Sequence, residues 1–259
     1  MDTMNIKHFE AFGPMIVEEW QLHKHESFIL NRWNTFNLFE ITRGINRFKG
    51  LEKMLTELIN KGITIEGYPE IKQWTDTTDE FSNPSLEREI KKFPNAIGLQ
   101  KALNWSNKVN SKIKTLPEVG PFENVKETLA KISLQADIAI VSSANLAAVE
   151  HEWNLYQFTP YLKGMFAQEA GTKEHCIKSL SKHYDKKNIV MLGDALGDYQ
   201  AAQVNNVFFY PILADKEAMS WLSFHDHYFT KFTQQTLTET DQIQLLQAFK
   251  NNLSEEKLS

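Results

Sequence analysis

The stretch NIVMLGDALGD, residues 188–198, joins a short apolar run to two aspartates that stand four positions apart. The aliphatic run before Gly193 is typical of a strand that is buried on both faces of a parallel sheet. Asp194 and Asp198 follow where that strand ends. Ligands of open parallel sheets bind beyond the carboxyl ends of the strands, so this stretch predicts the fold class and also the place of the chemistry.

Two more apolar runs in the second half of the chain have the same character, ADIAIV at 136–141 and VFFY at 207–210. Amphipathic stretches that predict helices lie at 145–153, 173–183 and 198–205. Strands that alternate with helices indicate right-handed βαβ units and a parallel sheet covered on both faces. Residues 117–259 are therefore predicted to form an α/β domain with a Rossmann-type parallel sheet.

The first half of the chain has an almost entirely helical pattern. In GLEKMLTELINKG, residues 50–62, apolar side chains recur every three or four positions, and residues 96–115 repeat that pattern. The polar stretch 74–85 predicts a loop that leads to a helix start near Ser82 or Asn83. We therefore predict a leading segment, a helical domain and the α/β domain, at 1–15, 16–116 and 117–259.

The composition is that of a folded chain with no marked attraction for polyanions. Of 259 residues, 42% are hydrophobic and 24% are charged, which suffices for a full core. The formal net charge is −5, and this balance disfavours nucleic acid and anionic lipid as partners. The single cysteine, Cys176, cannot form an internal disulfide. Because no stretch resembles a signal peptide or reaches the ~20 apolar residues of a membrane span, the sequence predicts a cytoplasmic protein without membrane contact.

The aspartate pair at 194 and 198 predicts a metal site. Two carboxylates on one tight turn repel each other unless a cation compensates them. Mg²⁺ prefers hard oxygen ligands and keeps several waters, so a loop with two carboxylates suits it. The alternative is that Asp194 and Asp198 are solvated and cap the next helix.

Polar residues also follow the strand predicted at 136–141. Ser142, Ser143 and Asn145 stand there, where their side chains and the first amides of the next helix could hold an anion. Equally, Ser143 or Asn145 could simply cap that helix. Lys173 lies at the start of another predicted helix, where its charge opposes the helix dipole, and this position is a hint of a bound anion.

A group of cations lies in the helical half. The stretch TRGINRFK, residues 42–49, contains Arg43, Arg47 and Lys49 around a glycine. These side chains could bind a carboxylate or a phosphate of a substrate. The alternative is that they form salt bridges between helices.

Taken in order along the chain, these features resemble the haloacid dehalogenase-like (HAD) hydrolase superfamily. VSSAN at 141–145 is similar to the second motif of that superfamily, Lys173 to the third and GDALGD at 193–198 to the fourth. The resemblance covers residues 117–226. It implies a hydrolase, most often a phosphatase, in which an inserted helical cap domain encloses the substrate above the parallel-sheet core.

The resemblance also implies roles for individual residues. Ser142 would hydrogen-bond the transferring phosphoryl group, Lys173 would offset its negative charge, and Asp194 would bind Mg²⁺. Asp198 would assist in metal binding directly or through water. Lys163 is a second candidate for the role of the lysine. Such a set suits phosphoryl transfer, which needs positive charge placed around the phosphoryl oxygens.

One motif of the superfamily is missing from the sequence. Members carry their nucleophile in an Asp-x-Asp motif at the end of a central first strand, and no two aspartates of this chain stand two residues apart. The start of the chain, residues 1–5, is similar to the stretch that follows this motif. Either the nucleophile strand precedes Met1, or a pseudoenzyme has lost it. We favour the first explanation, because loss of a central strand would leave backbone groups of its neighbours unpaired.

The sequence thus predicts a Mg²⁺-dependent phosphatase that acts on a small phosphorylated metabolite through an aspartyl-phosphate, with the nucleophile strand absent from residues 1–259. The alternative is a non-catalytic protein that binds an anion or a phosphometabolite in the same pocket. The sequence predicts neither the identity of the substrate nor the oligomeric state.

Overall fold

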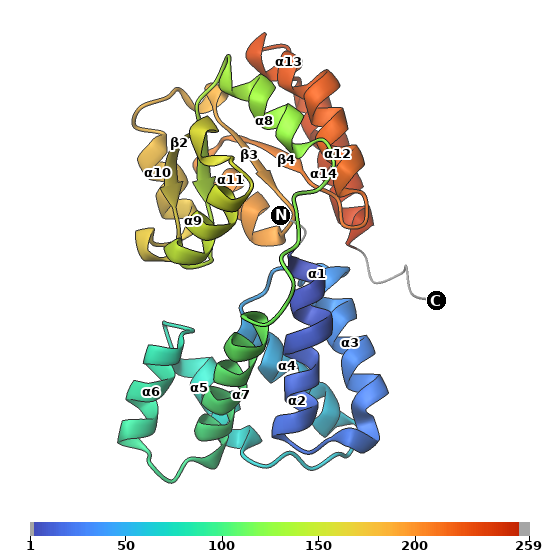
Figure 1. The fold of residues 1–259 in the computed structure, drawn as a ribbon, viewed down its shortest axis with the longest axis vertical. Helices are drawn as coiled ribbons and strands as arrows, with labels where there is room; N and C mark the ends of the chain where they lie inside the picture. Colours follow the sequence, from blue (N-terminus) through green and yellow to red (C-terminus); the bar gives the residue numbers. More distant parts are fainter. Residues whose placement is uncertain (1–2, 254–259) are drawn as a thin grey trace. The chain divides into compact units, whose positions relative to one another are not determined.

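The computed structural model describes residues 3–253, which form two compact units (Figure 1). The helical unit consists of residues 3–38 and 45–118. Of the described residues, 39–44 and 119–253 form the α/β unit. The segment 39–44 therefore belongs to the α/β unit, although the sequence placed it inside the helical domain. Met1 and Asp2, on which part of the resemblance to the nucleophile stretch rests, lie outside the described residues.

The helical unit is built, within the described residues, from α1 (Met4–Lys7), α2 (Gly13–Glu19), α3 (Glu26–Leu38), α4 (Arg47–Asn60), α5 (Tyr68–Thr77), α6 (Asn83–Lys92) and α7 (Ile97–Ile113). Polar side chains cap two of these helices. Asn46 Oδ1 accepts a hydrogen bond from Phe48 N (2.9 Å) at the start of α4, and Ser82 Oγ accepts one from Ser85 N (3.2 Å) at the start of α6. The predicted helix start near Ser82 is confirmed.

Helix α5 continues to Thr77, although the sequence predicted a loop from residue 74 onward. Trp74 is 4% exposed, and its ring lies edge-on to Phe48 with the ring centroids 5.2 Å apart. Burial of so large a ring stabilises the last helical turn more than the polar side chains around it disfavour it. The loop prediction was wrong for residues 74–77 because a tertiary contact overrides the local pattern.

Aromatic side chains fill the core of the helical unit. Trp33, Phe48 and Trp105 are all buried. The two indole N–H groups are nevertheless satisfied, since Trp33 Nε1 donates to His8 Nδ1 (2.9 Å) and Trp105 Nε1 donates to Phe12 O (3.2 Å). The helical unit thus has a hydrophobic core of its own.

The α/β unit contains, within the described residues, α8 (Val125–Ser133), β1 (Ile138–Val141), α9 (Leu146–Leu155), β2 (Leu162–Phe166), α10 (Lys173–Leu180), β3 (Val190–Gly193), α11 (Leu196–Asn205), β4 (Phe208–Pro211), α12 (Glu217–Ser223), α13 (Phe229–Thr233) and α14 (Glu239–Asn252). The predicted alternation of short strands and helices is confirmed. Of all helices in residues 3–253, none combines the length and the apolar composition needed to cross a membrane.

The strands of the described chain form two parallel pairs and not one continuous sheet. Strand β1 pairs with β2, with Ile140 opposite Met165, and β3 pairs with β4, with Met191 opposite Phe209. No described strand joins β1 to β3. Each of the four strands therefore keeps one edge without a partner among the described residues.

Side chains of β3 and β4 alternate between two hydrophobic clusters. Met191 and Phe209 pack with residues of α11 and α14, whereas Val190, Leu192 and Tyr210 pack with residues of α8 and α13. Successive residues of a strand point to opposite faces, so this alternation means that helices cover both faces of the pair. The loop that begins at Asp194 leaves the sheet at the carboxyl end of β3.

The last helix carries a capping box that makes its stability depend on pH. Asp241 Oδ2 accepts from Thr238 N (2.9 Å), Thr238 Oγ1 accepts from Asp241 N (3.1 Å), and Lys231 Nζ donates to Asp241 Oδ1 (2.7 Å). The hydrogen bond from Lys231, followed by those from Thr238, lowers the pKa of Asp241 to about 2.

Asp241→Ala is expected to lower the free energy of unfolding by about 1 kcal/mol at pH 6. A carboxylate whose pKa is lowered by folding contributes stability above its unfolded pKa of about 3.9, and this contribution is lost as the pH falls toward 2. The difference between variant and parent in urea unfolding should therefore shrink between pH 4 and pH 2. Thr240→Ala, at an exposed position of the same turn, is the control. A difference that stays constant over this pH range would contradict the assignment.

Candidate functional site

The loop after β3, residues 193–198, is organised by the buried carboxylate of Asp198. Asp198 is 2% exposed, and its Oδ2 accepts hydrogen bonds from Asp194 N and Ala195 N, both at 3.1 Å. The side chain folds back so closely over Gly193 that a Cβ there would lie 2.3 Å from the Cβ of Asp198. Only glycine fits at position 193, and the hydrogen bonds to Asp198 hold the loop 193–198 in its shape.

Lys173 reaches the other oxygen of this carboxylate. The residue opens α10, where Thr172 Oγ1 caps the helix by accepting from His175 N (3.3 Å), and Lys173 Nζ donates to Asp198 Oδ1. Burial raises the pKa of Asp198, and the charge of Lys173 opposes that effect. The structure thus brings two of the predicted site residues together as an ion pair between a half-buried lysine and a buried carboxylate, and both carboxylate oxygens of Asp198 are engaged.

Arg43 lies in the same unit and contacts the other predicted metal ligand. Its Nε and Nη2 lie 3.0 and 2.8 Å from Asp194 Oδ2, and its Nη2 lies 3.5 Å from Glu217 Oε1. Arg43 is 4% exposed. Gly44 makes this approach possible, because it has a φ of 75° and a Cβ there would lie 2.8 Å from the Cβ of Ala195. The segment 39–44 is therefore packed directly onto the loop 193–198.

The other two cations of the predicted cluster belong to the helical unit and contact its side chains. Arg47 Nη1 donates to Asn110 Oδ1 (2.7 Å), and Lys49 Nζ lies 4.7 Å from the ring centroid of Phe81. Burial lowers the pKa of Arg47. The structure thus separates Arg43 from Arg47 and Lys49. The contacts described above for these two are a hydrogen bond and a cation–π contact, and not the salt bridges between helices that the sequence left as an alternative.

Two of the polar residues after β1 accept hydrogen bonds from nearby backbone N–H groups. Asn145 Oδ1 accepts from Ala148 N (2.9 Å) and caps α9, which was the alternative left open for this residue. Ser142 is half-buried and its Oγ accepts from Ala144 N (3.1 Å), while Ser143 is exposed. Lys163, the second candidate for the lysine, is exposed within β2.

Two acidic residues near these loops were not predicted from the sequence. Glu217, at the start of α12, is one-tenth exposed at its side chain, and burial raises its pKa while Arg43 opposes this effect. Glu169 places both carboxylate oxygens, at 3.2 and 3.0 Å, on Leu146 N at the start of α9, where the sequence predicted an anion. Both residues follow ordinary helical or turn sequences, so no local signal distinguished them.

The donor set of the loop does not fit Mg²⁺ in this arrangement. Within residues 3–253, no three His, Cys, Asp or Glu side chains are grouped closely enough to hold a metal ion. Mg²⁺ needs carboxylate oxygens open to it. Both oxygens of Asp198 are engaged by amides and Lys173, and Asp194 is paired with Arg43. The two carboxylates that predicted a metal site are each compensated by a side-chain cation.

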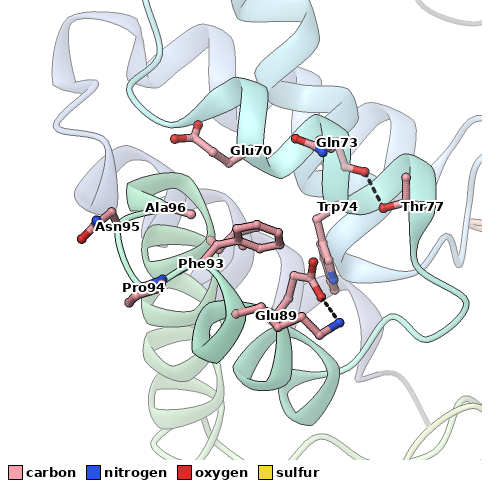
Figure 2. Close-up of a pocket in the computed structure, with 11 residues that line it drawn as sticks. Glu70, Gln73, Trp74, Thr77, Glu89, Phe93, Pro94, Asn95 and Ala96 are labelled. Carbon is pink, nitrogen blue, oxygen red and sulfur yellow. Dashed lines mark hydrogen bonds and ion pairs between the residues drawn. The ribbon is translucent and has the colours of Figure 1, made fainter.

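A cavity of about 430 Å³ lies in the helical unit. Its apolar wall includes Trp74, Phe93 and Leu99, and Glu70 and Glu89 lie among its polar residues. Figure 2 shows Trp74 of α5 and Phe93, which directly follows α6, directed toward the same opening. None of the residues predicted to carry the chemistry lines this cavity.

The chain was compared with families of known proteins. The family of haloacid dehalogenase-like hydrolases matches residues 65–212, which is more than half of the chain. The matched region includes Ser142, Lys173, Asp194 and Asp198, whereas Arg43 precedes it. No curated protein and no solved structure gives a significant match. The resemblance found in the three motifs is therefore confirmed, and the chain belongs to the haloacid dehalogenase-like hydrolases.

Proposed function

We propose that this chain is the main part of a phosphatase that removes phosphate from a small phosphorylated metabolite in the cytoplasm. The observation that carries the proposal is the ion pair between Lys173 and the buried carboxylate of Asp198, at the loop that follows β3. A lysine held there by a buried carboxylate is a fixed positive charge at the end of a strand. Phosphoryl transfer needs such charge, because negative charge spreads over the phosphoryl oxygens in the transition state.

Ser142 supports the same assignment from the neighbouring strand pair. It directly follows β1, and its backbone N donates to Phe166 O (2.8 Å), so that the end of β1 is fixed to the end of β2. The hydroxyl of Ser142 is half-buried and retains the capacity to donate to a phosphoryl oxygen while it accepts from Ala144 N. Ser142 is proposed to position the phosphoryl group, and Lys173 to offset its charge.

The nucleophile is proposed to be an aspartate on a strand outside residues 3–253. The free edges of β1 and β3 support this step, since a parallel strand there would pair with backbone groups that have no strand partner in the described chain. The apolar strand β1 is also incompletely buried, with Ala139 exposed and Ile140 half-buried. A strand of this composition is normally covered on all sides in a parallel sheet.

The proposed activity is expected to depend on Mg²⁺ only when Asp194 is released from Arg43. Because Asp194 is paired with Arg43 and Asp198 is engaged, a cation has no open carboxylate pair in the present arrangement. In this arrangement, Arg43 and Lys173 supply the positive charges that compensate Asp194 and Asp198.

The test compares the 259-residue chain with a chain extended upstream by an apolar strand that ends in Asp-x-Asp. The extended chain is expected to hydrolyse p-nitrophenyl phosphate in the presence of Mg²⁺, and the 259-residue chain at least about 100-fold more slowly. Asn in place of the first aspartate of the added motif should abolish the gain, and Lys163→Met, at an exposed position of β2, should leave it intact. No hydrolysis by a folded extended chain, with several phosphate esters and Mg²⁺ supplied, would count against a phosphatase.

A non-catalytic phosphometabolite-binding protein is the second candidate. It is favoured by the absence of Asp-x-Asp from the sequence and by the compensation of Asp194 through Arg43. Calorimetric titration of phosphate and of sugar phosphates distinguishes the two functions. A binder shows Lys173-dependent affinity in the 259-residue chain and no turnover after extension, whereas the phosphatase shows turnover.

A further inference from the structure

Arg43 stands out because its contacts join positions far apart in the sequence. The arginine comes from the short segment 39–44, which leaves the helical unit, and its partner Asp194 lies 151 residues later. Two nitrogens of one guanidinium converge on the same oxygen, Asp194 Oδ2. Both contacts are charge-assisted, and such contacts are stronger than those between neutral groups.

We propose that Arg43 is the resident counter-cation of Asp194, so that a divalent cation binds the loop 193–198 only when the guanidinium leaves that carboxylate. The inference takes the location of the site from the proposed function, but it concerns cation binding and needs no turnover. It makes Arg43 a positioning residue that controls access of metal to Asp194.

The charges around the loop support competition and disfavour simultaneous binding. Three carboxylates, Asp194, Asp198 and Glu217, lie against two cations, Arg43 and Lys173. A divalent cation would add two positive charges next to Arg43 and Lys173. Positive charge at a buried place is costly unless an anion enters with it.

The geometry disfavours sharing of the Asp194 carboxylate between Arg43 and a divalent cation. The side chain of Asp194 is 38% exposed, so a hydrated cation can approach it from solvent. An ion on this carboxylate would nevertheless lie within several ångströms of a guanidinium that is 3% exposed and poorly screened. Repulsion between the two cations therefore opposes binding until Arg43 moves.

The segment that carries Arg43 is packed at both ends, because Phe39 packs against the cluster around Phe209 and Gly44 lies against Ala195. The turn between them is closed by a hydrogen bond from Arg43 N to Glu40 O (2.8 Å). The backbone of Arg43 is therefore held next to the loop 193–198, so that the guanidinium stays close to Asp194 unless a cation displaces it.

The test measures Mg²⁺ binding by calorimetry and by thermal unfolding, in the 259-residue chain without substrate. Arg43→Gln is expected to lower the melting temperature without metal, to bind Mg²⁺ at least 10-fold more tightly than the parent, and to regain stability as Mg²⁺ is added. The double variant Arg43→Gln with Asp194→Asn should lose both gains. The control Arg32→Gln removes a comparable pair, with Glu57 at 2.7 Å, and should leave Mg²⁺ affinity unchanged.

Equal Mg²⁺ affinity in parent and Arg43→Gln would overturn the proposal, as would tighter binding that survives Asp194→Asn. Arg43→Lys keeps the charge and serves if the Gln variant does not fold; it should bind Mg²⁺ no more than 3-fold more tightly than the parent. A further measurement uses the parent chain, in which the NMR signal of the Arg43 Nε–H group, identified by its loss in Arg43→Lys, should shift as Mg²⁺ saturates. A signal that stays unchanged at saturation would contradict displacement. Absence of phosphatase activity in the extended chain leaves each of these outcomes unaffected.

Discussion

Gly98→Ala is expected to lower the free energy of unfolding of the helical unit by about 3 kcal/mol or more. Alanine is normally the better residue inside a helix, by about 1 kcal/mol. Here the added Cβ would lie 1.8 Å from Gly67 O and 2.6 Å from Gly67 C. Both atoms belong to the backbone, so the clash is relieved only if α5 and α7 move apart and lose packing around Leu99. Urea unfolding followed by tryptophan fluorescence measures the loss.

Gly62→Ala provides the matched control in the same unit. Gly62 has a φ of 79°, but no atom lies within 4 Å of the position that a Cβ would take. The control is therefore expected to cost about 1 kcal/mol, from backbone strain alone. If Gly98→Ala cost no more than this control, the close approach of the two helices would be incorrect.

Lys173→Met is expected to lower the free energy of unfolding at pH 7 by about 3 kcal/mol, because it leaves the buried carboxylate of Asp198 without its cation. The amides of Asp194 and Ala195 remain as donors, and the loop 193–198 would retain part of its shape. Chemical denaturation at several pH values measures the effect.

The pH dependence identifies the charge on Asp198 as the cause. Burial raises the pKa of Asp198 above its ordinary value of 3.8, and Lys173 opposes this rise, so that Lys173→Met raises the pKa further. A carboxyl group whose folded pKa is raised contributes stability at low pH and loses it as the pH rises through the folded pKa. The destabilisation should therefore be small below pH 4 and should grow above it. Lys178→Met, at an exposed position of the same helix, should change stability little at any pH, and a pH-independent loss for Lys173→Met would point to packing and not to charge.

The strand β3 and the family could be predicted from the sequence, because both depend on patterns of residues that are close together or in a fixed order along the chain. The apolar run before Gly193 predicts β3, and the order of serine, lysine and aspartates predicts the family, which the match over residues 65–212 confirms. The pairing of Lys173 with Asp198 was not predicted, because the resemblance assigned Lys173 to the phosphoryl group and Asp198 to a metal ion. Local patterns and strand order were enough for the family and not for the contacts between these residues.

The role of Arg43 could not be predicted, because it depends on where the chain crosses between units. The sequence around Arg43 is continuous with a helical pattern, and Arg47 and Lys49 have the same local appearance. Only the three-dimensional course of residues 39–44 places one of the three cations on Asp194 and leaves the other two in the helical unit. The helical extent of α5 was missed for a related reason, because Phe48 and Trp74 meet only in the folded unit.

Because residues 39–44 belong to the α/β unit, they also determine where the chain can be divided into fragments. A fragment that begins at Val119 would be contiguous in sequence, yet it would lack Arg43, Gly44 and Phe39, and so the cation of Asp194 and part of the cover over Phe209. A fragment that ends at Glu118 would carry these residues without the surfaces on which they pack. The boundary in the sequence and the boundary between the units therefore do not coincide, because the first half of the chain encodes a piece of the α/β unit.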